Sequence, residues 1–344
     1  MIFKAKYEQK TFIFRRPSGT SRGILTEKKS WFITLWNEDN PFIKGFGECS
    51  VIPGLSPDYL NDKQYELKIE DVVKKINYFI ENLHELKSFP SILFGLEIAL
   101  LDLKNGGDKI FFNTNFTKGN QGIPINGLIW MGDEKFMQEQ VEQKLTEGYS
   151  CIKMKIGAID FEKEIEILKN IRKKYNVNEI TLRVDANGAF SPEEAPQKLV
   201  QLAELEIHSI EQPIRQGQMD EMRDLCAKNT LPIALDEELI GINKREKKED
   251  LLDRIQPQYI ILKPSLIGGF KGTKEWIELA EEREIPWWIT SALESNIGLN
   301  AIAQFTSTYP IEMEQGLGTG SLYTNNIPSR LEVKQGKLFL RKEI

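Results

Sequence analysis

Three acidic residues recur at almost equal intervals through the middle of the sequence. Asp185, Glu211 and Asp236 lie 26 and 25 residues apart, and each ends a short β-rich run. This interval is close to one strand–helix unit of a barrel, since about 250 residues over eight units give about 31 each. We therefore expect the three carboxylates to converge on a hard divalent cation, Mg²⁺ or alternatively Mn²⁺. Separate roles as helix caps or loop carboxylates would explain one such acid, but they explain three in register poorly.

Lysines flank these acids on the neighbouring β-rich runs. Lys153 and Lys155 are two residues apart, so they face the same side of a strand, and Lys263 ends a later run. Lysines inside a barrel need anionic partners, which the metal carboxylates and a substrate carboxylate would supply. Burial and a nearby cation both lower the pKa of a lysine, so such a lysine can act as a base near neutral pH. The pattern predicts proton abstraction beside a carboxylate, with the cation offsetting the negative charge that develops on its oxygens.

A few further polar residues stand close to this pattern. Arg183 precedes Asp185 by two residues and shares its inward face, where it would either bind an anionic substrate or tether an acid. Asn187 and Glu237 follow expected metal ligands closely, and we expect them to support those ligands. The charged run 244–250 mixes both signs, which predicts a helix face exposed to solvent.

The elements that must position these residues alternate between strands and helices from residue 121 to 315. Strands are expected near 123–126, 150–155, 180–185, 207–211, 231–236, 259–263, 286–290 and 311–315. The helices between them are expected at 133–147, 160–175, from 191 onward, and at 219–228, 243–254, 271–283 and 296–308. The third helix is expected to begin with Ser191 as its N-cap and Pro192 at its first position.

Eight strands joined by short connections and helices predict parallel strands closed into a barrel. An open doubly wound sheet is the alternative, and it would place a glycine-rich turn after its first strand. The segment 126–128 carries no such turn, and the glycines of 316–320 are followed by no helix pattern. The barrel is therefore the better interpretation.

Residues 1–120 have a different pattern, which indicates an α+β domain in front of the barrel. Alternating residues at 31–36 predict an antiparallel strand, and helices are expected at about 72–83 and 91–103. The strand-like tail 316–344 is expected to return to this first domain and complete it, which leaves 121–315 as the catalytic barrel.

Composition excludes several classes of protein. The 344 residues are 40% hydrophobic and 28% charged, which is typical of a globular chain of about two domains. The 45 basic and 51 acidic residues give a net charge of −6, which argues against a nucleic-acid-binding protein. No apolar run is long enough for a membrane span, and three distant cysteines do not indicate a disulfide framework. We expect a cytoplasmic protein, a monomer or a homo-oligomer, that acts on a small anionic carboxylate.

At this point the residues resemble a known family, the enolase superfamily, and more narrowly its muconate-lactonizing subgroup. The order Lys-x-Lys, Asp, Glu, Asp and Lys along the strand ends matches that family. Shorter stretches that agree are 45–49, 94–102, 184–188, 210–213 and 291–298. The resemblance covers nearly the whole chain. It implies an α/β fold, a modified TIM barrel of (β/α)7β type with an α+β capping domain, which agrees with the strands counted above.

The resemblance also implies an activity. The branch of the subgroup that the chain is most similar to carries out a syn dehydration of 2-succinyl-6-hydroxy-2,4-cyclohexadiene-1-carboxylate in menaquinone biosynthesis. Carried over by position, Lys155 would take the proton α to the ring carboxylate and then protonate the departing hydroxide. Lys263 would stabilise the enolate, and Lys153 belongs to the same catalytic set. The implied ligands of Mg²⁺ are Asp185, Glu211 and Asp236.

Substrate-binding residues are implied in the same way. The stretch 17–23 resembles the mobile loop of the capping domain, and 316–320 resembles the end of the eighth strand. The side chains and backbone expected to contact substrate are those of Arg183, Thr20, Ser21, Arg22, Ser291, Glu294 and Gly316.

Rival reactions share this frame. One lysine on each side of a substrate also permits racemisation or epimerisation, and muconate cycloisomerisation uses the same arrangement. Dipeptide epimerases of the subgroup usually carry Asp-x-Asp at the end of strand eight, whereas 316–320 contains no acid. This favours a dianionic substrate over one with an ammonium group, and it leaves racemisation of N-acylamino acids open. A non-catalytic binding barrel is the hypothesis from another class, and it would tolerate loss of the lysines.

Overall fold

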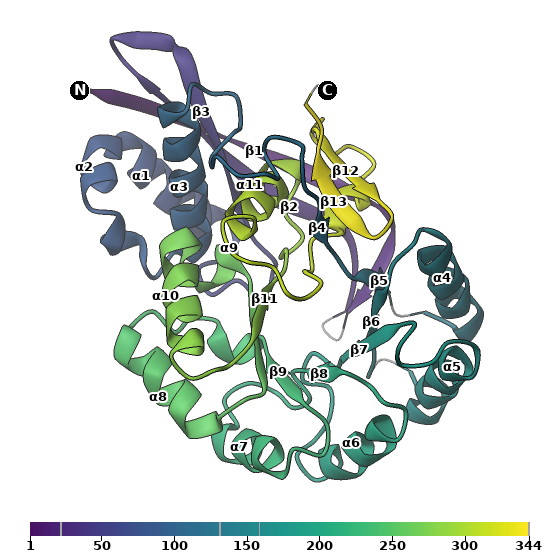
Figure 1. The fold of residues 1–344 in the computed structure, drawn as a ribbon. Coiled ribbons are helices and arrows are strands. Elements are labelled where there is room, and N and C mark those ends of the chain that lie inside the picture. Colours follow the sequence, from purple (N-terminus) through teal and green to yellow (C-terminus); the bar gives the residue numbers. More distant parts are fainter. Residues whose placement is uncertain (21–22, 131, 158, 343–344) are drawn as a thin grey trace.

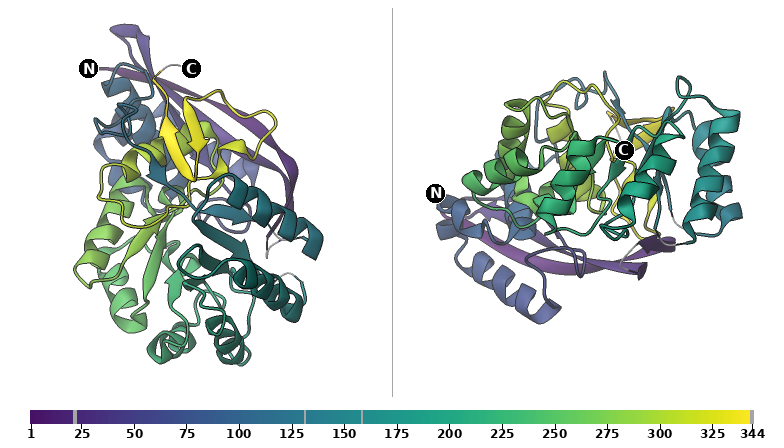
Figure 2. Two further views of the ribbon diagram at one scale, coloured as in Figure 1. Left: turned by 45° about the vertical axis from the view of Figure 1, so that its right-hand side comes forward. Right: turned by 90° about the horizontal axis from the view of Figure 1, so that it is seen from below.

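The computed structural model describes residues 1–20, 23–130, 132–157 and 159–342. Figure 1 shows a curled sheet ringed by helices, with an antiparallel sheet and further helices packed at one side. In Figure 2 the long strands of the antiparallel sheet lie across one end of the ring. The chain therefore forms a barrel with a cap over one of its ends.

The cap is a three-stranded antiparallel sheet covered by helices. Its strands are β1 (Phe3–Thr20), β2 (Gly23–Asn37) and β3 (Asn40–Ser50), in that order. Trp31, Ile33 and Leu35 alternate along β2 and bury one face of the sheet, as the pattern of 31–36 predicts. The covering helices are α1 (Asp62–Lys74), α2 (Ile76–Glu81), the short η1 (Leu83–Leu86) and α3 (Pro90–Lys104).

The helix expected at 72–83 was placed wrongly. In the structure α1 begins ten residues earlier, at Asp62, where the side chain of Asn61 accepts a hydrogen bond from the backbone N–H of Gln64. The helical run is broken at Lys75, whose φ of −108° and ψ of 32° depart from helical values. Tyr65, Ile69 and Val72, which α1 buries, have the four- and three-residue spacing of an amphipathic helix, so the sequence did carry a signal for the earlier start.

Within the part of the chain that the structure describes, seven parallel strands form the barrel sheet, in sequence order from β5 to β11. These are β5 (Gly127–Ile129), β6 (Cys151–Lys155), β7 (Thr181–Asp185), β8 (Ser209–Glu211), β9 (Ile233–Leu235), β10 (Tyr259–Leu262) and β11 (Trp287–Ile289). The helices around them are α4 (Glu134–Thr146), α5 (Phe161–Lys174), α6 (Ala195–Ala203), α7 (Met219–Lys228), α8 (Arg245–Ile255), α9 (Pro264–Ile267), α10 (Gly269–Glu281) and α11 (Asn296–Thr306).

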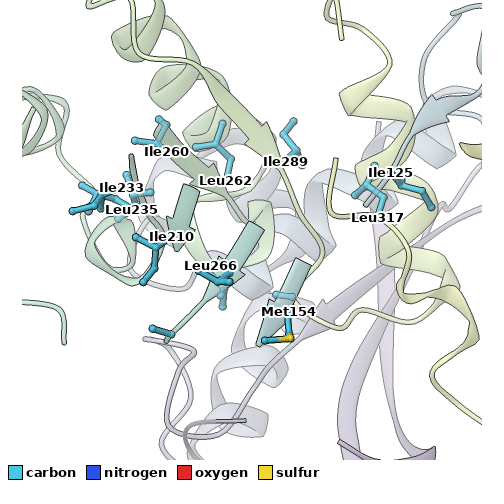
Figure 3. Packing of buried hydrophobic residues seen from close by; sticks show 14 of the residues in the cluster. Ile125, Met154, Ile210, Ile233, Leu235, Ile260, Leu262, Leu266, Ile289 and Leu317 are labelled. Atoms are coloured by element: carbon cyan, nitrogen blue, oxygen red, sulfur yellow. The ribbon is translucent and has the colours of Figure 1, made fainter. Parts of the chain in front are cut away.

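The two faces of each barrel strand have different surroundings. One face buries isoleucine, leucine and methionine against the surrounding helices, and Figure 3 labels members of this core such as Met154, Ile210 and Leu262. The alternate positions point into the barrel, where Ala234, Ile261 and Trp288 form a small inner cluster. Side chains alternate in direction along a strand. Asp236 lies two positions after Ala234, and Lys263 lies two positions after Ile261, so both also point into the barrel.

Closure of the barrel differs from the prediction. The expected first strand is divided, because Ile123–Pro124 forms β4 and pairs with the tail strand β13 (Lys337–Leu340) instead of a barrel strand. The expected last strand at 311–315 is reduced to two isolated bridges, from Gln315 to Ile125 and from Gly316 to Thr290. Very short pairings therefore complete the ring where eight regular strands were expected.

Two other predicted features need correction. Helix α6 begins at Ala195 instead of Ser191, because residues 192–194 form a turn in which the Ser191 hydroxyl accepts a hydrogen bond from the Glu194 N–H at 3.3 Å. The run 244–250 is not wholly exposed. Lys248 is buried within it, and its Nζ donates to Glu275 at 2.9 Å and to the Gly272 carbonyl at 3.1 Å.

The cap and the C-terminal tail both contact distant parts of the chain. Glu48 of β3 accepts hydrogen bonds from the backbone N–H groups of Ser295 and Gly298, both at 2.9 Å, at the N-terminus of α11. After the barrel, the Arg15 N–H donates to the Leu322 carbonyl at 2.8 Å, which joins the tail to β1. The tail then forms a hairpin of β12 (Leu331–Lys334) and β13 beside β4.

Within the described ranges, no helix combines the length and apolar character that crossing a bilayer requires. Cys49, Cys151 and Cys226 are all buried as free thiols.

Candidate active site

A cavity of about 280 Å³ lies between the carboxyl ends of the barrel strands and the cap. Its floor includes Lys153, Lys155, Asp185 and Lys263. Its other side is apolar and comes from the cap, through Ile24, Leu25, Ile52, Pro53 and Leu55. This combination of charged floor and apolar roof suits a small anionic molecule with a hydrocarbon part.

Strand register explains why the charged groups meet. Lys155 pairs with Asp185 on the next strand, and Asp185 pairs with Glu211 on the strand after that. Residues in register on neighbouring parallel strands point in the same direction, so all three side chains reach the same end of the barrel. Asp236 and Lys263 extend the row because each immediately follows the end of its strand.

The lysines and acids alternate in a row of ion pairs. Lys155 Nζ lies 2.8 Å from Asp185 Oδ2, and Lys153 Nζ lies 2.9 Å from the same oxygen. Lys153 also contacts Glu211 directly. Lys263 contacts Asp236 and lies 3.8 Å from Glu211 Oε1. Each acid therefore has a lysine beside it, as the burial argument requires.

The charges strongly shift the ionisation of this row. Burial opposes the charge on Asp185, but Lys153, Lys155 and Lys263 outweigh burial and hold its pKa well below the usual range. Burial also opposes the charge on Lys153 and Lys263, yet the neighbouring carboxylates raise the pKa of both. The carboxylates beside these two lysines thus outweigh burial. Burial raises the pKa of Asp236 well above its usual value even though the charge of Lys263 opposes this, and Glu237 and Glu211 add to the rise.

The donor chemistry of the three acids fits a hard divalent cation. Asp185, Glu211 and Asp236 offer carboxylate oxygens on successive strands, all of them buried. Glu211 Oε1 is buried and accepts no hydrogen bond from the described residues, so it has an open coordination position. Within the described residues no three acidic, thiol or imidazole groups are already arranged to hold a metal ion, and Lys153 and Lys263 contact the three carboxylates.

Asn187 is placed at the centre of the supporting contacts. Its Oδ1 accepts a hydrogen bond from Lys155 Nζ at 2.6 Å, and its backbone N–H donates to Asp185 Oδ1 at 3.0 Å. Its Nδ2 donates to Glu237 Oε1 at 3.2 Å. Asn187 has a φ of +44°, a left-handed conformation that asparagine tolerates better than most residues. It thus links the predicted base to a predicted metal ligand.

Arg183 does not line the cavity. It is buried below it, where its Nη1 donates to the Glu314 carbonyl at 2.8 Å and its guanidinium lies 4.3 Å from the centre of the Trp288 ring. Its Nη2 is 3.8 Å from the Glu314 carboxylate. Of the two roles expected for Arg183, these contacts support the tethering of an acid. The acid is Glu314, which precedes Gln315 at the closure of the barrel.

The other predicted substrate contacts have mixed outcomes. Ser291 and Gly316 line the cavity. Glu294 is fully buried beside the cavity wall, where it accepts hydrogen bonds from Ser265 at 2.5 Å and from the cavity-lining Ser291 at 2.6 Å. Ser21 and Arg22 lie outside the described residues, as does the side chain of Thr20. Gly23 and Ile24, which follow directly, do line the cavity.

Two amide residues at the site were missed by the sequence analysis. Gln212 is fully buried, and its Oε1 accepts hydrogen bonds from the backbone N–H groups of Asp236 at 3.2 Å and Glu238 at 3.4 Å. It thereby joins two of the acid-bearing strand ends, and its position directly after Glu211 was the signal available. Asn126 lines the cavity with a buried Oδ1 that accepts no hydrogen bond from described residues.

Comparison with known proteins gives consistent matches. Residues 136–343 match the family described as enolase C-terminal domain-like. The chain is 50% identical to the o-succinylbenzoate synthase of Desulfotalea psychrophila, over 96% of this chain and 97% of that protein. The crystal structure of MenC from the same organism aligns with a TM-score of 0.86 at 46% identity, covering 98% of this chain and 99% of that one. Muconate lactonizing enzyme from Pseudomonas fluorescens aligns with a TM-score of 0.82 at 21% identity, over 99% and 94% of the two chains, and this supports the fold alone.

Proposed function

Because the chain belongs to the enolase C-terminal domain-like family and, within it, to the o-succinylbenzoate synthases, we infer that it is a carbon–oxygen lyase of menaquinone biosynthesis. Its reaction is the syn dehydration of 2-succinyl-6-hydroxy-2,4-cyclohexadiene-1-carboxylate to 2-succinylbenzoate. The observation in the site that best supports this is the pair of cavity-lining lysines, Lys155 and Lys263, on strand ends separated by the three acids.

The chemistry requires one group that can both remove and return a proton. The Nζ of Lys155 takes the proton from the ring carbon that bears the carboxylate, and the electron pair moves into the carboxylate to form an enediolate. The carbon–hydroxyl bond on the neighbouring ring carbon then breaks, and the ammonium of Lys155 donates its proton to the departing hydroxide to form water. The contacts of Lys155 with Asp185 and Asn187 orient its Nζ for both steps.

Lys263 contributes charge from the other side of the cavity. Its pKa is raised, although burial opposes its charge, because Asp236 and Glu211 stand beside it. A positively charged group at this place is suited to stabilise a developing enolate. Lys153, which contacts both Asp185 and Glu211, holds these two acids together.

Asp185, Glu211 and Asp236 are proposed to hold Mg²⁺, with Mn²⁺ as an alternative. When bound, the cation would neutralise negative charge on the substrate carboxylate oxygens, whose α-proton is otherwise very weakly acidic. The carboxylate donor set and the open oxygen of Glu211 support this assignment. A small anionic substrate, a cytoplasmic location and a monomeric or homo-oligomeric form remain predictions.

Racemisation of N-acylamino acids is a second candidate, because lysines on both sides of the cavity permit removal of a proton from one face and its return to the other. An acylated nitrogen carries no charge, so the absence of an acid in 316–320 does not count against it.

The direct test is an ultraviolet assay of the purified protein with the cyclohexadiene substrate and Mg²⁺. We expect the absorbance of the diene to disappear as the aromatic product forms. No dehydration, together with racemisation of N-succinylamino acids, would replace the proposed reaction with the second candidate.

A further inference from the structure

The cap supplies a carboxylate to a barrel helix that lacks a capping side chain of its own. Helix α10 begins at Gly269, and the residue in its N-cap position is Gly268. Glu97, on helix α3 of the cap, accepts hydrogen bonds from the backbone N–H groups of Phe270 at 2.6 Å and Lys271 at 3.4 Å. Figure 1 shows α3 beside α9 and α10. A side chain from the cap thus satisfies N–H groups that a helix normally leaves unpaired.

The glycines at this point allow the close approach. Gly268 and Gly269 have φ values of +105° and +68°, which turn the chain sharply from α9 into α10. A Cβ atom on Gly269 would lie 2.2 Å from Glu97 Oε2, so only glycine leaves space for the carboxylate. Phe94, one turn before Glu97 on α3, packs edge-on against Phe270 with ring centres 5.2 Å apart.

The contact of Glu97 with the start of α10 lies shortly after Lys263 in the chain. Lys263 occupies the N-cap position of α9, a single turn of four residues, and its carbonyl accepts a hydrogen bond from the Leu266 N–H at 2.8 Å. Gly268 and Gly269 follow α9 directly. The Nζ of Lys263 therefore sits on a short segment whose far end is held by the cap.

Glu294 of the barrel holds the same segment from the other direction, through the hydroxyl of Ser265 at 2.5 Å. We propose that Glu97 is a positioning residue for Lys263: it anchors the α9–α10 turn from the cap, so that docking of the cap sets the placement of the catalytic lysine. The proposal rests on the proposed function of Lys263 and adds a residue outside the cavity to the machinery of that site.

A purely structural role for Glu97 is the alternative, and the chain offers a matched control for it. Asp102 lies on the same helix and also accepts two backbone hydrogen bonds, from Phe46 at 2.9 Å and Lys109 at 2.7 Å. Neither partner belongs to the barrel strands or to the helices that surround them. Asp102→Ala thus removes the same kind of bond from the same helix without touching the α9–α10 turn.

The experiment compares Glu97→Ala, Glu97→Gln and Asp102→Ala with the unmodified protein, at a temperature where circular dichroism shows all four folded. We expect kcat for dehydration to fall about ten- to a hundredfold in Glu97→Ala, the loss typical of a misplaced catalytic group. KM and the Mg²⁺ concentration dependence should stay unchanged. Glu97→Gln keeps one acceptor and should be intermediate. Asp102→Ala should lower the melting temperature and leave kcat unchanged.

Hydrogen exchange measured by mass spectrometry supplies a readout that needs no activity. Glu97→Ala, or Glu97→Gln if the alanine variant does not fold, should speed exchange across residues 263–271, whereas Asp102→Ala should not. Unchanged kcat and unchanged exchange in the Glu97 variants would overturn the proposal. Absence of dehydration in the unmodified protein would contradict the proposed function instead, and faster exchange at 263–271 would still support the anchoring role of Glu97.

Discussion

At the scale of single residues, the site is a row of buried charges that neutralise one another. Removing one member of a buried ion pair is costly because it leaves an uncompensated charge behind. Here Asp185 contacts two lysines, Lys153 contacts two acids, and Lys263 stands against Asp236. An alanine truncation in this row therefore needs circular dichroism to show that the variant still folds, whereas a nearly isosteric substitution separates an effect on chemistry from one on folding more directly.

Asp236→Asn is such a substitution, and it tests the metal assignment. The amide keeps an acceptor for Lys263 but removes a negative charge from the proposed ligand set. We expect activity to fall by more than the 10–100-fold loss typical of residues that only support a ligand, while circular dichroism stays that of the folded protein. Steady-state rates over a titration of Mg²⁺ measure the effect. Full activity of the unmodified protein in excess chelator would rule out the metal.

Substitution of the two cavity-lining lysines separates their roles. Lys155→Ala removes the group held by Asp185 and Asn187, so it should abolish both dehydration and exchange of the substrate α-proton with deuterated solvent. Lys263→Arg keeps a positive charge of different shape, so its activity should fall mainly through misfit. Proton exchange followed by NMR distinguishes the cases. Exchange that persists in Lys155→Ala and is lost in Lys263→Ala would make Lys263 the base.

The acids and lysines that meet could be predicted from the sequence because they end consecutive strands. Side chains alternate in direction along a strand, so their inward direction could be predicted too. It could not predict residues whose position depends on how the ring closes. Arg183 has the inward direction that we expected, but Trp288 and Glu314 hold it below the cavity. Glu294 follows a turn after β11 and has no strand periodicity, so nothing in the sequence showed that it faces Ser265 and Ser291.

At the scale of elements, helices with a clear apolar period were predicted to within a few residues, and the ends of the barrel were not. Helix α7 (Met219–Lys228) has the bounds that we expected. The segment 123–126 was assigned to one strand, but the tail hairpin competes for it and pairs with Ile123–Pro124. Such a competition between segments far apart in the sequence cannot be seen in local periodicity.

The closure at Gly316 gives an element-scale prediction. A Cβ atom on Gly316 would lie 2.1 Å from Oγ1 and 2.5 Å from Cβ of Thr290, the residue just after β11 to which Gly316 is bridged. Gly316→Ala should therefore force the bridge apart and destabilise the protein by about 1–3 kcal/mol, as overpacking typically does. Gly318→Ala is the matched control, since its nearest neighbour would be 3.5 Å away. Thermal unfolding measures both, and equal losses would show that the closure accommodates a side chain at 316.

At the scale of the whole molecule, the cap and the barrel together enclose the candidate active site. The barrel provides the charged floor of the cavity, and the cap provides its apolar roof through residues such as Leu25 and Ile52. Carboxylates of the cap, Glu48 and Glu97, also bind the N-termini of α11 and α10. The packing of the cap that covers the cavity therefore also holds α10 and α11, the last helices of the barrel.

The charge of the cavity predicts its specificity. Lys153, Lys155 and Lys263 line the cavity and are balanced by Asp185, Glu211 and Asp236, so a bound divalent cation would leave the site positive; the segment 316–320 adds no acid. A dianionic substrate meets favourable charge there, whereas the ammonium of a dipeptide has no carboxylate beside the eighth strand. We expect a higher kcat/KM for dehydration of the cyclohexadiene dicarboxylate than for epimerisation of L-Ala-L-Glu. Gly318→Asp, at a position with space for a side chain, should lower kcat/KM for the dianion through repulsion. Dipeptide epimerisation faster than dehydration in the unmodified protein would reverse this order, because the cavity would then accept an ammonium without an acidic partner.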